Sequence, residues 1–385
     1  MSDSLDLDVD SNLQFEKGSY VSCYCESLGS HMKAQILDFK QKDNTAFAYI
    51  TFVGQDKRLD DWFPVDSLKV ISSSDDEDDA SQDSRFDDDD KPESNQFELV
   101  HREVTKIRNI ECITLGAHKM RTWYYSPYPH QFHNTPHLYI CEYCFEYFQC
   151  KEDLARHQSK NKRFEPYGRE IYRDGKINIY EMKGNCQKVP CQCLCLLGKL
   201  FLDHKTLYYD VEKFSFYLLC ECDDDGCHLA AYSSREVDTE DQNVLACIVV
   251  FPPFQKRGYG RLLISLSYEI ARRKRMPGGP ERPLSDLGQR AFTSFWRDKI
   301  VEMLRDHPGA ISTIENLVEL TGIAEEDIKN TLEMYQLAHV VLGKTKITIN
   351  HNSLTRELNI LSKKTEMRFI PRKLIWMPDD DLYDM

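Results

Sequence analysis

The hydrophobic pattern between Val244 and Ile270 predicts a strand, a glycine-bearing loop and a helix in direct succession. An unbroken apolar run rich in β-branched residues indicates the strand, which ends at Phe251 before two consecutive prolines. Apolar residues at helical spacing indicate the helix that follows: Leu262, Leu263, Leu266 and Ile270. The intervening loop therefore connects the end of the strand to the start of the helix.

That loop, QKRGYGR from Gln255 to Arg261, is suited to hold an anion. Glycines at 258 and 260 let backbone N–H groups approach a phosphate, and the helix N-terminus adds partial positive charge. Lys256, Arg257 and Arg261 supply countercharge from their side chains. The alternative is an ordinary strand–turn–helix in which the glycines only make the turn tight.

A second pattern, from Phe15 to Ile71, alternates apolar and polar residues over short segments. It predicts a small all-β unit built from YVSCYC, MKAQILDF, AFAYITFV and the ending RLDDWFPVDSLKV. Most of its aromatic residues are expected in the core and in cross-strand pairs, and the alternative is a partial cage for a methylated lysine. These residues are Tyr20, Tyr24, Tyr49, Phe52, Trp62 and Phe63.

An acidic segment with too few apolar residues to fold follows this unit. Between Asp75 and Glu93 it has eleven acidic residues against Arg85 and Lys91, so it accounts for nine of the fourteen net negative charges. We predict a disordered linker over residues 72–95 that provides solvation and spacing, with contact to basic proteins or serine phosphorylation as alternatives. The acidic residues 1–14 are also expected to be disordered.

The composition sets broader limits. With 385 residues, 41% hydrophobic and 29% charged, the chain can form at least one large core and two or three units. No apolar run is long enough to cross a membrane, and the N-terminus lacks the basic and apolar regions of a signal peptide. We therefore expect an intracellular, soluble protein, in which the fourteen cysteines are thiols, metal ligands or a nucleophile rather than a disulfide framework.

Cys141, Cys144 and His157 have the spacing of a zinc site. A gap of two residues places both thiolates on one face of a tight knuckle, and a histidine on the following helix supplies a third ligand. The fourth ligand is missing where it is expected, because Asn161 is a poor zinc ligand. The chain therefore predicts a structural zinc knuckle with an incomplete ligand set.

Cys150, His133 and His137 are candidates for the fourth ligand, although none has the usual spacing. The alternative is a finger that has lost its metal and is held by apolar packing. The residues that would pack are Leu138, Tyr139, Phe145, Phe148 and Leu154.

Three further cysteines, in CQCLC from Cys191 to Cys195, do not indicate a second metal site. Gaps of one residue would point successive thiols to the same side of a strand, and no partner cluster follows. The segment from Cys191 to Tyr217 is expected to form strands around a turn at Asp203 and His204, with buried thiols in a core strand.

The C-terminal part predicts helices and a short strand pair. Leu284 to Arg305 has the pattern of an amphipathic helix, and residues 310–349 predict two shorter helices followed by HVVLG and KITIN. This is the pattern of a winged helix-turn-helix. Its acidic residues argue against a phosphate-binding face and suit a basic peptide: Glu315, Glu319, Glu325, Glu326 and Asp327.

Taken in order, the finger, CLCLLGKLFLDHKTLYYDV, ACIVVFPPF, QKRGYGR and GGPERPLSDLG resemble the MYST family of histone acetyltransferases. The resemblance extends from about Val104 to Pro378, and KRLDDWFPVDSL resembles the end of a chromo-barrel, or tudor-knot, domain. It implies an α+β fold, with a small N-terminal β-barrel and an acetyltransferase α/β core between a zinc-finger-like lobe and a C-terminal winged helix-turn-helix-like lobe. The implied limits are 15–71 for the barrel and 96–385 for the acetyltransferase domain, the latter divided at 138–163, 164–283 and 284–378. FIPRKLIWMP resembles the family's C-terminal strand, with Trp376 buried.

The resemblance also implies how acetyl-CoA is bound. Residues 255–261 would hold its pyrophosphate, with backbone donors at Arg257, Gly258, Tyr259 and Gly260. Main-chain groups of one strand would hold its pantetheine arm, and two serines would make further contacts. These residues are Ile248, Val249, Val250, Ser285 and Ser294.

The same resemblance implies roles at or near the active site for three residues. Glu281 aligns with the general base, which must deprotonate a lysine whose free pKa is about 10.4. Cys247 aligns with the active-site cysteine, which either accepts the acetyl group before lysine does or only positions residues for direct attack. Lys205 falls where the family has a lysine that becomes autoacetylated, and the alternative is a solvent-exposed lysine at a turn.

The resemblance implies a nuclear catalytic subunit of a multiprotein complex that acts on histone tails and nucleosomes, with no membrane partner. The barrel's ligand, a methylated lysine or RNA, is left open. Two other classes are considered: a small-molecule N-acetyltransferase that shares only the coenzyme loop, and a chromatin-binding module with weak catalysis.

Overall fold

The computed structural model describes residues 15–71, 105–132, 135–203, 205, 209–237, 243–340, 346–365 and 367–378. The acidic N-terminus and the acidic linker predicted above lie outside the described residues, as do His133 and His204. The chain divides into two compact units. The first contains Met1–Asn109 and Trp123–Pro127, and the second contains Ile110–Thr122 and Tyr128–Met385.

The first unit contains an antiparallel sheet that confirms the predicted small all-β unit. Side chains of its first strand alternate, with Val21 and Cys23 buried and Tyr20 and Tyr24 exposed. Two 3-10 turns, η1 (Lys57–Leu59) and η2 (Val65–Ser67), flank the fourth strand. In the order of pairing, the strands are β4 (Asp61–Pro64), β3 (Thr45–Phe52), β2 (Ser30–Lys42), β1 (Tyr20–Cys25) and β5 (Lys69–Val70).

The second unit is built around another antiparallel sheet, whose strands pair in the order of the chain. They are β10 (Arg169–Asp174), β11 (Ile177–Lys183), β12 (Phe214–Cys222), β13 (Cys227–Glu236) and β14 (Cys247–Val250). Strand β14 therefore forms one edge of this sheet.

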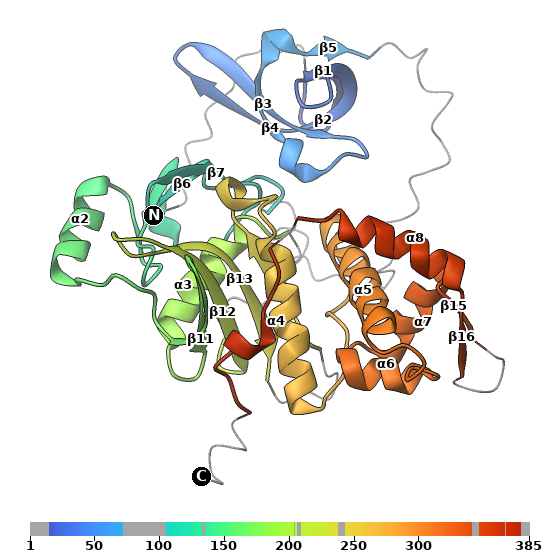
Figure 1. The fold of residues 1–385 in the computed structure, drawn as a ribbon. Helices are drawn as coiled ribbons and strands as arrows, with labels where there is room; N and C mark the ends of the chain where they lie inside the picture. Colours follow the sequence, from blue (N-terminus) through green and yellow to red (C-terminus); the bar gives the residue numbers. More distant parts are fainter. Residues whose placement is uncertain are drawn as a thin grey trace, which may run out of the picture. The chain divides into compact units, whose positions relative to one another are not determined.

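Two helices, α3 (Lys188–Lys199) and α4 (Tyr259–Lys274), cover opposite faces of this sheet (Figure 1). Tyr232 of β13 meets Gly198 of α3, whereas Val250 of β14 meets Gly260 of α4. Tyr232 is paired with Val249, the neighbour of Val250, and neighbouring side chains of a strand point to opposite faces. The predicted strand, loop and helix are confirmed as β14, the turn η4 (Pro252–Phe254) and α4.

The predicted strand over Cys191–Cys195 is wrong, because these residues lie in α3. Seven residues of this helix are buried, and its polar residues Lys188, Gln192 and Lys199 repeat at helical spacing, which the gaps between the cysteines did not indicate. The prediction that the thiols of Cys191, Cys193 and Cys195 are buried is confirmed. Twelve cysteines of the chain are free, and Cys222 and Cys227 form a disulfide between β12 and β13.

A small lobe precedes the central sheet and contains the candidate zinc ligands. Strands β6 and β8 pair in parallel, and β7 and β9 flank them. The elements are β6 (Cys112–Leu115), β7 (His118–Arg121), η3 (His130–Phe132), β8 (His137–Ile140), β9 (Tyr147–Phe148) and α2 (Lys151–Lys160).

The C-terminal lobe confirms the predicted long helix, two shorter helices and strand pair. Helix α8 (His351–Ser362) was not predicted. Figure 1 shows these helices beside α4, in orange to red. The predicted elements are α5 (Asp286–Asp306), α6 (Ile314–Thr321), α7 (Glu325–Met334), β15 (Ala338–Val340) and β16 (Ile347–Ile349).

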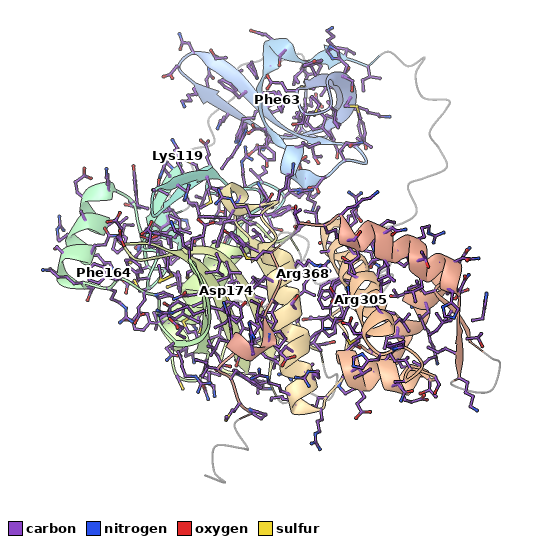
Figure 2. The ribbon with its side chains drawn as sticks, viewed as in Figure 1. Phe63, Lys119, Phe164, Asp174, Arg305 and Arg368 are labelled. Atoms are coloured by element: carbon purple, nitrogen blue, oxygen red, sulfur yellow. A yellow bond between two sulfur atoms is a disulfide. The ribbon has the colours of Figure 1, made fainter. Side chains whose placement is uncertain are left out.

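The C-terminal segment returns to the central sheet through the turn η5 (Pro371–Lys373). Lys373 pairs with Asp174 of β10, which is labelled in Figure 2. Trp376 is buried, as predicted, and its Nε1 donates to Glu181 Oε1 at 2.9 Å. None of the described helices is long and apolar enough to span a membrane.

We predict that Gly198→Ala destabilises the protein. A Cβ atom at this position would lie 1.7 Å from Tyr232 Oη, and Tyr232 is fully buried and has no room to move away. Overpacking of this kind costs about 1–3 kcal/mol, so the thermal unfolding midpoint should fall. Val189→Ala, at an exposed position of the same helix, is the control, and equal midpoints for the two variants would contradict the prediction.

Candidate active site and zinc site

Cys247 begins the edge strand β14 and faces the side of the sheet that α3 covers. It pairs with Ser234, which has the same facing as Tyr232, and Tyr232 packs against α3. Lys205 is 7% exposed and points its Nζ at Cys247 Sγ, 3.8 Å away. The structure thus brings together two residues that are 42 positions apart in the chain.

The surroundings of Lys205 are thiols rather than water. Burial disfavours its ammonium group, but the sulfurs of Cys195 and Cys247 outweigh this effect and raise the pKa of Lys205. Burial raises the pKa of Cys195 to about 11, with Lys205 opposing the shift. Lys205 Nζ therefore lies among sulfur atoms and away from water. The alternative of a solvent-exposed lysine is wrong.

Glu281 reaches the same region from a separate loop. The N–H of Glu281 donates to the Leu245 carbonyl at 2.9 Å, and the N–H of Val244 donates to the Gly279 carbonyl at 2.9 Å. Leu245 and Pro280 form a parallel bridge. These contacts place the loop alongside the residues that lead directly into Cys247, while the Glu281 residue is exposed.

The loop between β14 and α4 has the geometry of an anion-binding turn. Lys256 and Gly258 have positive φ angles of 61° and 90°, and Gly258 is the N-cap of α4. The first intrahelical bond runs from the N–H of Leu262 to the Gly258 carbonyl at 3.0 Å. The N–H groups of the first turn, from Tyr259 onward, precede the helical bonding pattern and are suited to bind an anion.

Carboxylates hold the side chains of this loop. Glu221 Oε1 accepts from Arg257 at 2.8 Å and from the Tyr259 hydroxyl, and burial together with Glu221 raises the pKa of Tyr259 to about 12. Gln255 Nε2 donates to the Val250 carbonyl at 3.0 Å, which ties the loop to β14. Arg261 NH2 lies 2.8 Å from Asp298 Oδ2. Lys256 is exposed.

The two candidate serines lie on or next to α5. Ser285 caps this helix by accepting from the Gly288 N–H at 3.1 Å. Ser294 accepts from Lys364 Nζ at 3.4 Å, and the same ammonium group bonds to Asp298. Ser294 and Arg261, both expected to contact the coenzyme, are therefore joined through Asp298.

Asp298 is a site residue that the sequence prediction missed. It is 1% exposed and binds Arg261, Arg297 and Lys364, which come from three different segments. A signal was present, since an acidic residue lies here among the apolar residues of an amphipathic helix. Nothing in the sequence indicates Lys364, because its contact joins residues 66 positions apart.

Cys141, Cys144 and His157 converge, with their ligand atoms all within 4.8 Å of one another. Cys144 Sγ lies 3.2 Å from His157 Nε2, and the opposite ring nitrogen lies 3.4 Å from Glu146 Oε2. The hydrogen bond between the two thiols lowers the pKa of Cys141 and raises that of Cys144. Two thiols, an imidazole and an outer carboxylate fit a zinc ion.

None of the described candidates completes this ligand set with a fourth side chain. Asn161 contacts Nδ1 of His157 at 3.4 Å and so lies on the side of the ring away from the thiols. Cys150 donates to Asp153, and His137 contacts Cys112 and Thr114. Among the described residues, the metal-binding group consists of the three predicted ligands.

Three family models match the chain in consecutive segments. Residues 15–70 match the tudor-knot, described as an RNA binding activity-knot of a chromodomain. Residues 107–160 match the MYST family zinc finger domain, and residues 165–375 match the MOZ/SAS family. The zinc-finger match and the three converging ligands together support a zinc ion in this lobe.

Several curated proteins are similar along most of the chain. A putative MYST-like histone acetyltransferase 1 of Oryza sativa subsp. japonica is 37% identical, covering 96% of this chain and 86% of the relative. The histone acetyltransferase of the MYST family 2 of Arabidopsis thaliana is 36% identical, covering 96% and 87%. The histone acetyltransferase Tip60 homolog of Caenorhabditis elegans is 41% identical, covering 72% and 62%.

We predict that zinc content depends on His157. The purified protein should contain about one zinc ion per chain, because thiolates and imidazole are the ligands of structural zinc sites. His157→Ala should lose most of this zinc, as measured by elemental mass spectrometry. Cys150→Ala, in the same lobe but outside the cluster, should retain it, and equal zinc contents in the two variants would contradict the assignment.

Proposed function

The chain belongs to the MOZ/SAS family of MYST histone acetyltransferases, and we propose that it acetylates lysines of nucleosomal histone tails with Glu281 as general base. It is a histone lysine acetyltransferase, and acetyl-CoA is the acetyl donor of this family. The observation that carries the assignment of the base is the hydrogen bond from the Glu281 N–H to the Leu245 carbonyl. It supports placing the carboxylate beside the strand that begins at Cys247.

The chemistry requires a proton acceptor at this place. A substrate lysine attacks as the neutral amine, and its pKa of about 10.4 leaves little of that form at neutral pH. Glu281 takes the proton, the lysine nitrogen bonds to the acetyl carbonyl carbon, and the carbon–sulfur bond breaks. Coenzyme A leaves with the electron pair of that bond and is protonated.

Cys247 has two roles compatible with its position. In the covalent route its sulfur accepts the acetyl group and then passes it to lysine, with Glu281 deprotonating each nucleophile in turn. In the direct route lysine attacks acetyl-CoA, and Cys247 contributes packing on the α3 face. Glu281 is required in both routes, so the proposal does not depend on choosing between them.

The remaining contacts to acetyl-CoA are assigned along one continuous path. The edge of β14, at Ile248, Val249 and Val250, pairs with the amides of the pantetheine arm, because an edge strand has backbone groups that no neighbouring strand uses. The loop 255–261 binds the pyrophosphate through its backbone N–H groups. Ser285 and Ser294 bind the coenzyme further along α5.

The proposed partners are the histone substrate and the other subunits of a multiprotein complex. The exposed Glu319, Glu325 and Glu326 of the C-terminal lobe complement a basic histone tail, and chromatin as substrate places the protein in the nucleus. We assign the chain to a multiprotein complex as its catalytic subunit. The domain limits expected from the sequence stay a prediction.

The barrel favours RNA over a methylated lysine as its ligand. Tyr49 is buried and Lys40 Nζ lies 4.2 Å from the centre of the Trp62 ring, so these two aromatic residues are poorly suited to a cage. Tyr20 and Tyr24 are 51% and 47% exposed on β1, with Lys33 close to the Tyr20 ring. Exposed rings beside a cation suit base stacking and backbone contact.

We predict that Glu281→Gln lowers the rate of acetyl transfer to nucleosomes by about 100-fold or more, because general-base catalysis contributes about 10²–10⁴-fold. The initial rate is measured with purified protein and labelled acetyl-CoA. Glu212→Gln is the matched control, since it makes the same change in an exposed ion pair with Lys188.

Activity retained by Glu281→Gln would show that another group is the base. No transfer to histones by the unmodified protein, even with partner subunits present, would contradict the enzyme assignment itself. Transfer to small amines but not to histones would favour a small-molecule acetyltransferase.

We also predict that Lys205 is acetylated in the active protein. Acetylation replaces a buried ammonium group by a neutral amide, so the site no longer has to stabilise a charge away from water. Peptide mass spectrometry should detect acetylated Lys205 in the protein without substitutions and should not detect it in the Glu281→Gln variant. An unmodified Lys205 in active protein would contradict this prediction.

A further inference from the structure

The loop that contains Glu281 is held by the C-terminal lobe as well as by the central sheet. The N–H of Gly278 donates to the Gly322 carbonyl at 3.0 Å, and the N–H of Ala324 donates to the Gly278 carbonyl at 3.0 Å. Gly278 and Ile323 form a parallel bridge. The loop therefore lies between the residues before β14 on one side and the turn that leads into α7 on the other.

One side chain of α7, Asp327, contacts this loop on both sides of Glu281. Its Oδ1 accepts from Arg282 NH2 at 2.5 Å. Its Oδ2 closely approaches Gly279, where a Cβ atom would lie 2.8 Å away. The carboxylate thus faces the residue two positions before Glu281 and the residue directly after it.

These contacts constrain the direction of Glu281. Arg282 directly follows Glu281, so its ion pair with Asp327 fixes the chain immediately after Glu281 on the α7 side. The Glu281 N–H is at the same time fixed to Leu245. A backbone bond on one side and an ion pair on the other therefore fix the backbone from which the exposed Glu281 side chain extends.

The ion pair is asymmetric in its exposure. The Asp327 side chain is 3% exposed, whereas the Arg282 side chain is 53% exposed. Burial raises the pKa of Asp327, and Arg282 opposes this shift. Burying the Asp327 carboxylate costs desolvation free energy that its ion pair with Arg282 seldom offsets in full. Stability alone therefore does not explain the pair.

We propose that Asp327 is a positioning residue for the general base, holding Glu281 toward β14 by its contacts with Gly279 and Arg282. The proposal rests on the proposed function of Glu281 and adds a residue from the C-terminal lobe to the catalytic arrangement. Asp327 acts through the loop and does not touch the substrate. The C-terminal lobe thereby determines how well the base is aligned.

The first test compares Asp327→Asn with Asp306→Asn, the same loss of charge in an exposed ion pair with Arg305 at the end of α5. Misplacement of a reacting group by about 1 Å lowers the reaction rate by about 100-fold. We therefore expect kcat for acetyl transfer to a histone peptide to fall by about 10- to 100-fold in Asp327→Asn. The KM for acetyl-CoA should stay within about twofold, because the coenzyme contacts lie elsewhere. Asp306→Asn should leave both parameters unchanged.

The second test separates positioning from stability. Arg282→Lys keeps a cation for Asp327 and should retain most of the activity, whereas Arg282→Gln should reproduce the loss of kcat. Arg282 is exposed, so this pair of variants carries the test if Asp327→Asn fails to fold. Similar unfolding midpoints with different kcat values would support positioning. A kcat that follows only the folded fraction would overturn it.

The third test distinguishes failure of this inference from failure of the proposed function. If Asp327 acts through Glu281, adding Asp327→Asn to Glu281→Gln should cost no further activity. A multiplicative loss in the double variant would overturn the positioning role while leaving Glu281 as the base. Full activity of Glu281→Gln alone would instead overturn the proposed base, whatever Asp327 does.

Discussion

The backbone hydrogen bonds of residues 278–281 are the constraint on which the site depends. They join this loop to Val244 and Leu245 on one side and to Gly322 and Ala324 on the other. Backbone N–H and C=O groups away from water must be paired, so a loop bonded on both sides cannot shift without losing bonds. The position of Glu281, the proposed base, the start of β14 and the attachment of the C-terminal lobe are therefore set together.

The sequence predicted well those features that have a local cause. Two prolines and two glycines interrupt an apolar run and a helical pattern between Val244 and Ile270, and the structure has a strand, a turn and a helix there. Alternation likewise revealed the strands of the barrel. The strand predicted at Cys191–Cys195 was wrong because the prediction rested on the spacing of the thiols, whereas the polar residues Lys188, Gln192 and Lys199 repeat at helical spacing. The proximity of Cys247 and Glu281 was expected from the family resemblance and not from the physical pattern of either segment.

The parts of the site that could not be predicted are side-chain contacts between distant segments. Asp298 binds Lys364 from 66 positions away, and Asp327 binds Arg282 from 45 positions away. Such pairs depend on how the lobes pack, which neither composition nor periodicity contains. An acidic residue in a predicted helix is normally on its solvated face, so Asp327 looked like a surface charge in the sequence, whereas Asp298 lies among apolar residues of its helix. For Asp327 the expected contribution to a surface for basic peptides has to be revised, since its side chain is 3% exposed and already paired.

The two buried carboxylates suggest why the C-terminal lobe accompanies the catalytic core. Burying an ion pair seldom stabilises a protein more than apolar residues of similar size would. Asp298 nevertheless holds Arg261 beside the coenzyme loop, and Asp327 holds Arg282 beside the base. Both carboxylates belong to helices of the C-terminal lobe, α5 and α7, and both arginines belong to segments at the site. The lobe therefore orients groups at the two ends of the reaction path, where the precise placement of charge matters more to the rate than to stability.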